Sequence, residues 1–130
     1  MQAKIIAHYS DGRLVKGFST DFAPNKPMFH IGTGPTDTGA EVMIIELKAV
    51  FFVKDFEGNP GHERKQHFDE GEKVQGRKAK VTFNDGEILV GVVQSYDSER
   101  QGFFLVPADK DANNIRVYIV SASIADIAFT

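Results

Sequence analysis

The sequence has no cysteine, no long apolar run and little helical periodicity, and each absence excludes a class of protein. Without cysteine, no disulfide framework, thiolate nucleophile or thiolate metal site can form. The longest apolar runs, 42–45 and 49–53, are far shorter than the roughly 20 residues that span a bilayer. The apolar stretch near the first residue is too short for a secretory signal. We therefore expect a cytoplasmic protein with no membrane partner.

The composition is that of a folded chain. Of the 130 residues, 42% are apolar and 25% are charged, and phenylalanine alone occurs 11 times. So many aromatic and β-branched residues exclude intrinsic disorder, because they provide apolar surface to bury. The length suits one ordinary domain or two very small ones.

An internal repeat organises the chain. When the sequence is shifted by 74 positions, several residues of the first half fall on identical residues of the second half. Towards the end of each copy the matching shift is 77. Two copies are too few for a solenoid, so we expect two small domains. The boundaries are 1–53 for the first copy, 54–77 for a linker and 78–130 for the second copy. The identical pairs at a shift of 74 are Lys4 and Lys78, Asp11 and Asp85, Gly12 and Gly86, Gly17 and Gly91, and Phe29 and Phe103.

Each copy is expected to form five short strands. Asp11-Gly12 and Asp85-Gly86 are typical of tight hairpin turns, because these residues tolerate positive φ. Gly17 and Gly91 lie inside the following strand and indicate a bend that curls a short sheet into a barrel. The predicted fold class is all-β, with two tandem five-stranded small barrels. The expected strands are 5–9, 13–19, 28–31, 42–46 and 49–53, then 80–83, 87–94, 103–106, 116–120 and 124–129.

One segment of the second copy resembles a known motif. Asp85-Gly86, Gly91 and Tyr96-Asp97 have the residues and spacing of the first conserved motif of the Sm-like RNA-binding proteins. The resemblance implies a five-stranded, strongly bent SH3-like barrel. The whole chain also resembles an uncharacterised bacterial family of tandem Sm-like/SH3-like small β-barrels, to which no activity is attached.

The residues that hold a nucleobase in Sm-like proteins are missing from the second copy. The resemblance implies an asparagine four residues after Asp97, where Gln101 stands, and an Arg-Gly pair before Ile124, where Val120 and Ser121 stand. Arginine is favoured at such sites for its planar fork and stacking surface. The net charge of −3 falls in the second copy and weakens its attraction to phosphate. RNA is therefore a disfavoured partner.

A basic cluster near the linker is a candidate patch for an anion or a nucleic acid. It consists of Arg64, Lys65, Arg77 and Lys78. Acidic residues between them bring the net charge of the segment near zero, so the favoured interpretation is a solvent-exposed surface that binds no partner.

No residue pattern supports catalysis or a metal. His62 and His67 are five residues apart, so on a helix the two rings would point away from each other. The glycine-rich segment 32–39 leads into a strand, whereas a phosphate cradle leads into a helix. No serine or histidine has the setting of an activated nucleophile. We expect no catalytic residue, no metal and no cofactor, and we predict that the protein is not an enzyme.

Phenylalanines of the first copy are the candidate interface residues, namely Phe51, Phe56 and Phe22. Phe51 and Phe52 are neighbours on an expected strand and so point to opposite faces. If Phe52 faces its own core, Phe51 faces the other copy, the linker or a partner. Burial between the two copies is the favoured interpretation.

These observations predict a non-catalytic binding or interaction module. Its partner would be a protein, a second copy of the chain or a small ligand. The binding surface would be a groove between the two copies or an exposed strand edge, because small barrels leave edges that a partner strand can extend. The alternatives are an Sm-like nucleic-acid-binding protein, a regulatory accessory domain and, last, an enzyme.

Overall fold

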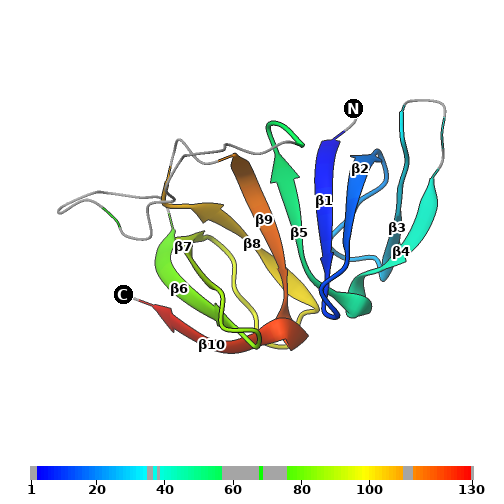
Figure 1. Cartoon of the computed structure of the whole chain (residues 1–130). Helices are drawn as coiled ribbons and strands as arrows, with labels where there is room; N and C mark the ends of the chain where they lie inside the picture. Colours follow the sequence, from blue (N-terminus) through cyan, green and yellow to red (C-terminus); the bar gives the residue numbers. More distant parts are fainter. Residues whose placement is uncertain are drawn as a thin grey trace.

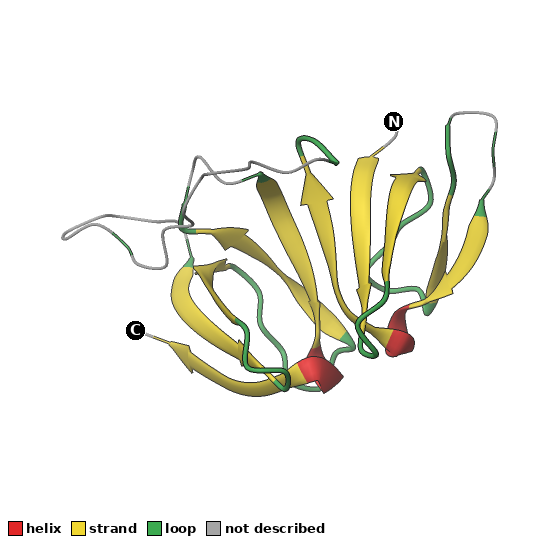
Figure 2. Cartoon of the chain, in the orientation of Figure 1, coloured by secondary structure: helices red, strands yellow, loops and turns green. Residues whose placement is uncertain are grey.

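The computed structural model describes residues 3–34, 37, 39–56, 68, 76–109 and 113–129. These residues form ten β-strands and two short 3₁₀ turns (Figures 1 and 2), so the predicted all-β class is confirmed. None of them belongs to a helix long and apolar enough to cross a membrane. The elements are β1 (Ala3–Tyr9), β2 (Leu14–Ser19), β3 (Met28–Ile31), β4 (Ala40–Met43), η1 (Ile44–Glu46), β5 (Leu47–Val53), β6 (Arg77–Phe83), β7 (Ile88–Val93), β8 (Gly102–Pro107), β9 (Asn114–Val120), η2 (Ser121–Ser123) and β10 (Ile124–Phe129).

The two copies have the same order of elements. In each, four strands are followed by a 3₁₀ turn and a fifth strand, so that β1–β5 correspond to β6–β10. The first hairpin of each copy turns at an Asp-Gly pair, where Gly12 has φ of 97° and Gly86 has φ of 92°. Glycine adopts this left-handed conformation without steric cost. Figure 2 shows both 3₁₀ turns on the same side of the molecule.

The glycine inside the second strand of each copy marks a close backbone approach. A Cβ atom on Gly17 would lie 2.5 Å from the carbonyl oxygen of Gly32, and one on Gly91 would lie 2.3 Å from that of Val106. In the first copy this approach joins β2 to Gly32, directly after β3, by a single β-bridge, and in the second β7 and β8 pair at the same place. The two copies are therefore bent at equivalent positions.

One antiparallel sheet runs through both copies. Its strand order is β10-β6-β7-β8-β9-β5-β1-β2, and β3 and β4 form a separate hairpin. At the centre of Figure 1, β5 of the first copy lies beside β9 of the second. Ala49 is opposite Ile119 and Phe51 is opposite Val117. We call this β5–β9 pairing the junction.

The prediction of two closed barrels requires correction. Closing each copy would pair its fourth strand with its fifth, that is β4 with β5 and β9 with β10. In the described residues β5 instead pairs with β1 and β9, and β10 pairs with β6. The reason is that every residue of β5 is buried. A strand that is apolar on both faces can serve two cores, whereas the wall of a single small barrel has one inner face.

The two cores lie on opposite faces of the sheet at the junction. Along β5, Ala49 and Phe51 pack in the core of the second copy. The alternate residues Val50 and Phe52 pack in the core of the first copy. Successive side chains of a strand point to opposite faces, so one strand contributes to both cores. β9 is shared in the same way, because Ile119 and Tyr118 belong to different clusters.

Candidate binding groove between the two copies

A groove with a volume of about 680 Å³ lies where the first copy meets the second, and we call it the junction groove. Its floor is the face of β7, β8 and β9 that points away from the second core. Phe104 and Val106 point into the groove, while Leu105 between them is buried in the core. Val106 is 49% exposed. The volume is in the range of small-molecule sites, which have a mostly apolar lining and few polar groups.

A loop of the first copy forms one wall of the junction groove and is fixed by hydrogen bonds to the second copy. The side-chain amide of Gln101 donates to the carbonyl oxygens of Pro24 (2.7 Å) and Lys26 (2.8 Å). The hydroxyl of Tyr118 also donates to the Pro24 carbonyl, at 3.1 Å. Gln101 occupies the position that the Sm-like motif gives to a base-binding asparagine, and here its amide holds the two copies together.

Phe22 anchors the same loop against the sheet. Its ring makes edge-to-face contacts with Phe29 (centroids 5.0 Å apart), Tyr118 (5.2 Å) and Phe52 (5.4 Å). Such geometry adds to the stabilisation that burial provides. Phe22, one of the predicted interface residues, therefore lies at the interface between the two copies.

The rim of the junction groove is polar. Asn25, Gln94 and Ser95 supply amide and hydroxyl groups, and Arg100 supplies a charge. Burial raises the pKa of Tyr118, so that phenol is neutral at physiological pH. Among the described lining residues there is no aspartate, glutamate, histidine or lysine. This lining offers apolar contact, hydrogen bonds and one cation, and it lacks the paired acid and base of a hydrolytic site.

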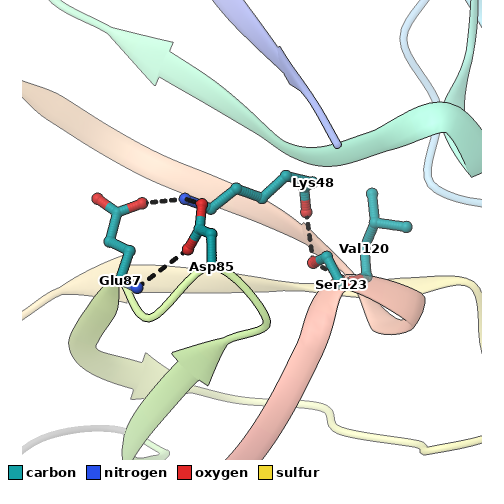
Figure 3. Close-up of polar contacts among 5 residues, drawn as sticks. All are labelled: Lys48, Asp85, Glu87, Val120 and Ser123. Atoms are coloured by element: carbon teal, nitrogen blue, oxygen red, sulfur yellow. Dashed lines mark hydrogen bonds and ion pairs between the residues drawn. The ribbon is translucent and has the colours of Figure 1, made fainter. Parts of the chain in front are cut away.

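Lys48 forms a second polar contact between the two copies (Figure 3). Its ammonium lies 2.7 Å from the Asp85 carboxylate and also pairs with Glu87. The side chain of Lys48 is only 11% exposed. The hydroxyl of Ser123 donates to the Lys48 carbonyl oxygen at 2.8 Å. These contacts tie β5 to the first turn of the second copy and to η2.

The electrostatics of this contact follow from burial and charge. Burial opposes the charge of Lys48, but hydrogen bonds to the two carboxylates outweigh it and raise the pKa of the ammonium. The hydrogen bond from Lys48 lowers the pKa of Asp85. Burial, and then the charge of Lys48, lower the pKa of His8, whose ring lies 4.2 Å from that of Phe51. His8 is therefore a neutral packing residue beside the ion pair.

The remaining predicted interface residues also pack within the chain. Phe51 is 4% exposed and lies in the second core. Phe56 is half-buried, and its ring meets that of Phe18 edge-on at 5.4 Å. Its carbonyl oxygen accepts a hydrogen bond from Lys16 at 3.1 Å. Both phenylalanines contribute to contacts inside one chain.

The structure describes half of the predicted anion patch. Arg64 and Lys65 lie outside the described residues. The Arg77 guanidinium lies 3.7 Å from the ring centroid of Phe129, and the Lys78 ammonium lies 5.0 Å from that of Phe68. Cations at these distances are attracted to the ring faces. The two described members thus make contacts with aromatic side chains.

No metal-ligating cluster of three or more side chains is present in the part of the chain that the structure describes. His62 and His67, the histidines with the spacing discussed above, lie outside that part.

Comparison with models of protein families gives one match over residues 1–130, to DUF6982, a family of unknown function. No curated protein and no solved structure matches the chain. The resemblance to the Sm-like proteins therefore rests on the hairpin motif alone.

Proposed function

Because the chain belongs to DUF6982, a family of unknown function, we propose a role from its own geometry: a non-catalytic binding module that takes a small ligand in the junction groove. In this proposal each copy is an Sm-like/SH3-like small barrel unit, opened where it joins the other. The observation that carries the proposal is the groove itself, with its volume of about 680 Å³ and walls from both copies.

The apolar floor of the junction groove supports a binding role. The outer face of a sheet that only meets water is usually polar. Here Val92, Phe104 and Val106 lie on that face, and Val106 is half exposed. A ligand that covers these side chains would gain about 25 cal/mol for each Å² of apolar surface removed from water.

The test is an NMR titration of the full chain with small aromatic probes. We expect shifted amide resonances to cluster at β7, β8 and the loop that contains Pro24 and Asn25. The substitution Val106→Glu, which places a carboxylate on the floor, should abolish these shifts. The matched control is Ile115→Glu, because Ile115 is equally exposed but is not among the lining residues. Shifts that are absent, or that cluster elsewhere, would contradict the proposal.

A protein that adds a strand to the sheet is the second candidate. β10 is an edge strand of the eight-stranded sheet and β4 is an edge strand of the separate hairpin, and among the described residues each pairs on one side only. Such edges can be extended by a partner strand. The Sm-like RNA-binding alternative has less support, because Arg77 and Lys78 face aromatic rings.

A further inference from the structure

The polar groups of the junction groove select among small ligands by charge. Arg100 is the one charged side chain among the described lining residues, and the others that are polar are amides and hydroxyls. A groove with a cation and no carboxylate favours an anion, because a guanidinium binds a carboxylate through two parallel hydrogen bonds.

The guanidinium of Arg100 is available for such a bond. Its side chain is 64% exposed, and its Nε forms a long ion pair with the Asp97 carboxylate at 3.8 Å. That distance exceeds a hydrogen bond, so the planar fork is not fixed by this neighbour. Arg100 and Tyr118 both line the groove; burial raises the pKa of Tyr118, and the charge of Arg100 partly offsets that effect. The guanidinium of Arg100 is therefore both exposed to solvent and part of the groove lining.

The floor of the groove selects by shape. The rings of Phe104 and Tyr118 have centroids 5.1 Å apart and are inclined at 67°, and Val106 continues the apolar surface. Tyr118 is only 1% exposed, so a flat apolar body would rest on Phe104 and Val106. The Arg116 guanidinium also lies over the Phe104 ring, 4.4 Å from its centroid. Asn25 and Ser95 also line the groove and supply hydrogen-bonding groups.

We propose that the junction groove binds a small amphipathic anion, with a planar apolar body on Phe104 and Val106 and a carboxylate at Arg100. This inference rests on the proposed function and adds the chemical class of the ligand. The anion lies at one end of the ligand, because Arg100 belongs to the loop that precedes β8 while the floor lies on β7, β8 and β9.

Three probes of the same shape and different charge test the inference. Naphthoate, naphthamide and naphthylmethylammonium are each titrated into the full chain at neutral pH, and binding is followed by amide NMR. We expect naphthoate to bind about tenfold more tightly than naphthamide, which is the effect of one charge-assisted hydrogen-bond pair at a partly exposed site. The ammonium probe should bind most weakly.

Arg100→Gln separates the charge from the rest of the groove. In this variant the preference for naphthoate over naphthamide should disappear, so that the two probes bind with equal affinity. The control is Arg13→Gln, because Arg13 is an equally exposed arginine in the first turn of the first copy. It should keep the full preference.

The possible failures are distinguishable. If naphthamide binds the wild-type groove as tightly as naphthoate, or if Arg100→Gln keeps the preference, the anion inference is wrong and the groove remains a binding site. If none of the three probes shifts the groove resonances, both the inference and the proposed function are wrong.

Discussion

The ammonium of Lys48 in β5 lies 2.7 Å from the carboxylate of Asp85 in the first turn of the second copy. The equivalent turn of the first copy is paired differently, because there Asp11 binds its own neighbour Arg13 at 2.8 Å. Glu87 stands at the place of Arg13 and joins Asp85 in binding Lys48. In both copies the aspartate also accepts a hydrogen bond from the backbone two residues on, and only in the second does its carboxylate bind Lys48 at the junction.

Replacing Lys48 should therefore destabilise the whole molecule. The substitution Lys48→Met keeps the length of the buried stem and removes the charge. We expect a loss of about 1–2 kcal/mol in the free energy of unfolding, a value discounted because Asp85 is largely exposed. Urea denaturation measures it. In the control, Arg13→Met breaks the exposed pair of the first copy and should cost less than about 0.5 kcal/mol. Equal effects of the two substitutions would contradict a special role for the junction contact.

The contribution of this ion pair should disappear at both ends of the pH range. The pKa of Asp85 is lowered from 3.8, so on acidification the unfolded chain takes up the proton first, and the stabilisation is lost as the pH falls through the folded pKa. The pKa of Lys48 is raised from 10.5, so the stabilisation is present below that value and lost as the pH rises through the folded pKa. The measurement is the difference in unfolding free energy between wild type and Lys48→Met across pH. A difference that stays constant below pH 3.8 would contradict the ion pair.

Alanine at either bending glycine should destabilise the chain. In Gly17→Ala and Gly91→Ala the new methyl group would meet a backbone carbonyl oxygen at 2.5 and 2.3 Å respectively. Backbone cannot move aside cheaply, so we expect a cost of about 1–3 kcal/mol for each. Thermal denaturation followed by circular dichroism checks both. Gly34→Ala is the control, because a Cβ there has no atom within 4 Å. If Gly91→Ala were as stable as Gly34→Ala, the close approach of β7 to β8 would be wrong.

The residues on β4 and β10 should prevent a head-to-tail chain of molecules. By the internal repeat, β10 corresponds to β5 and β4 to β9. If β10 of one molecule paired with β4 of the next as β5 pairs with β9, Asp126 would take the place of Ala49 and Glu41 that of Tyr118. Ala49 and Tyr118 are buried, and burying an unpaired carboxylate is costly. Charged residues on edge strands are a common protection against such pairing. We therefore expect no head-to-tail assembly by light scattering, although the sequence favoured self-association as one partner mode.

A double variant tests this protection. Glu41→Tyr combined with Asp126→Ala restores the junction residues at the two outer edges and should give assembly that increases with protein concentration. The control pairs Glu99→Gln with Asp97→Asn, two exposed acids of the loop before β8. Wild-type head-to-tail assembly would show that the acids do not protect the edges.

The positions of turns and strands could be predicted from the sequence because the same turn and glycine residues occur in both copies of the repeat. The Asp-Gly turns and the glycines at positions 17 and 91 recur at the same spacing, and all ten strands lie at the expected positions. Most strand ends differ from the expected ones by one to three residues, and β6 begins at Arg77 instead of residue 80. The expected strand 42–46 also runs past the end of β4 at Met43, because Ile44–Glu46 form a 3₁₀ turn. Periodicity does not distinguish a strand from a single 3₁₀ turn that follows it.

The pairing between copies could not be predicted, because local periodicity does not state which strand lies beside which. One signal was present in hindsight. Leu47–Val53 is apolar on both faces, whereas its counterpart Ile124–Phe129 carries Asp126 and Ala128 on its outer face.

The residues that build the candidate site were missed for the same reason. Lys48 and Gln101 bind groups of the other copy, so their roles depend on the junction. The position of Lys48, a lysine in an otherwise apolar strand, was a weak indication that it has a buried charged partner. Gln101 was noted as a departure from the Sm-like motif, but its contacts with the loop of the first copy follow only from the fold.

The most direct test of the shared sheet is a set of cross-strand nuclear Overhauser effects between β5 and β9. The shared sheet predicts contacts that place Ala49 opposite Ile119 and Phe51 opposite Val117, with slow hydrogen exchange along both strands. Two separately closed barrels would instead give contacts between β4 and β5 and between β9 and β10. Observation of that second set would contradict the junction, and with it the groove that the junction builds.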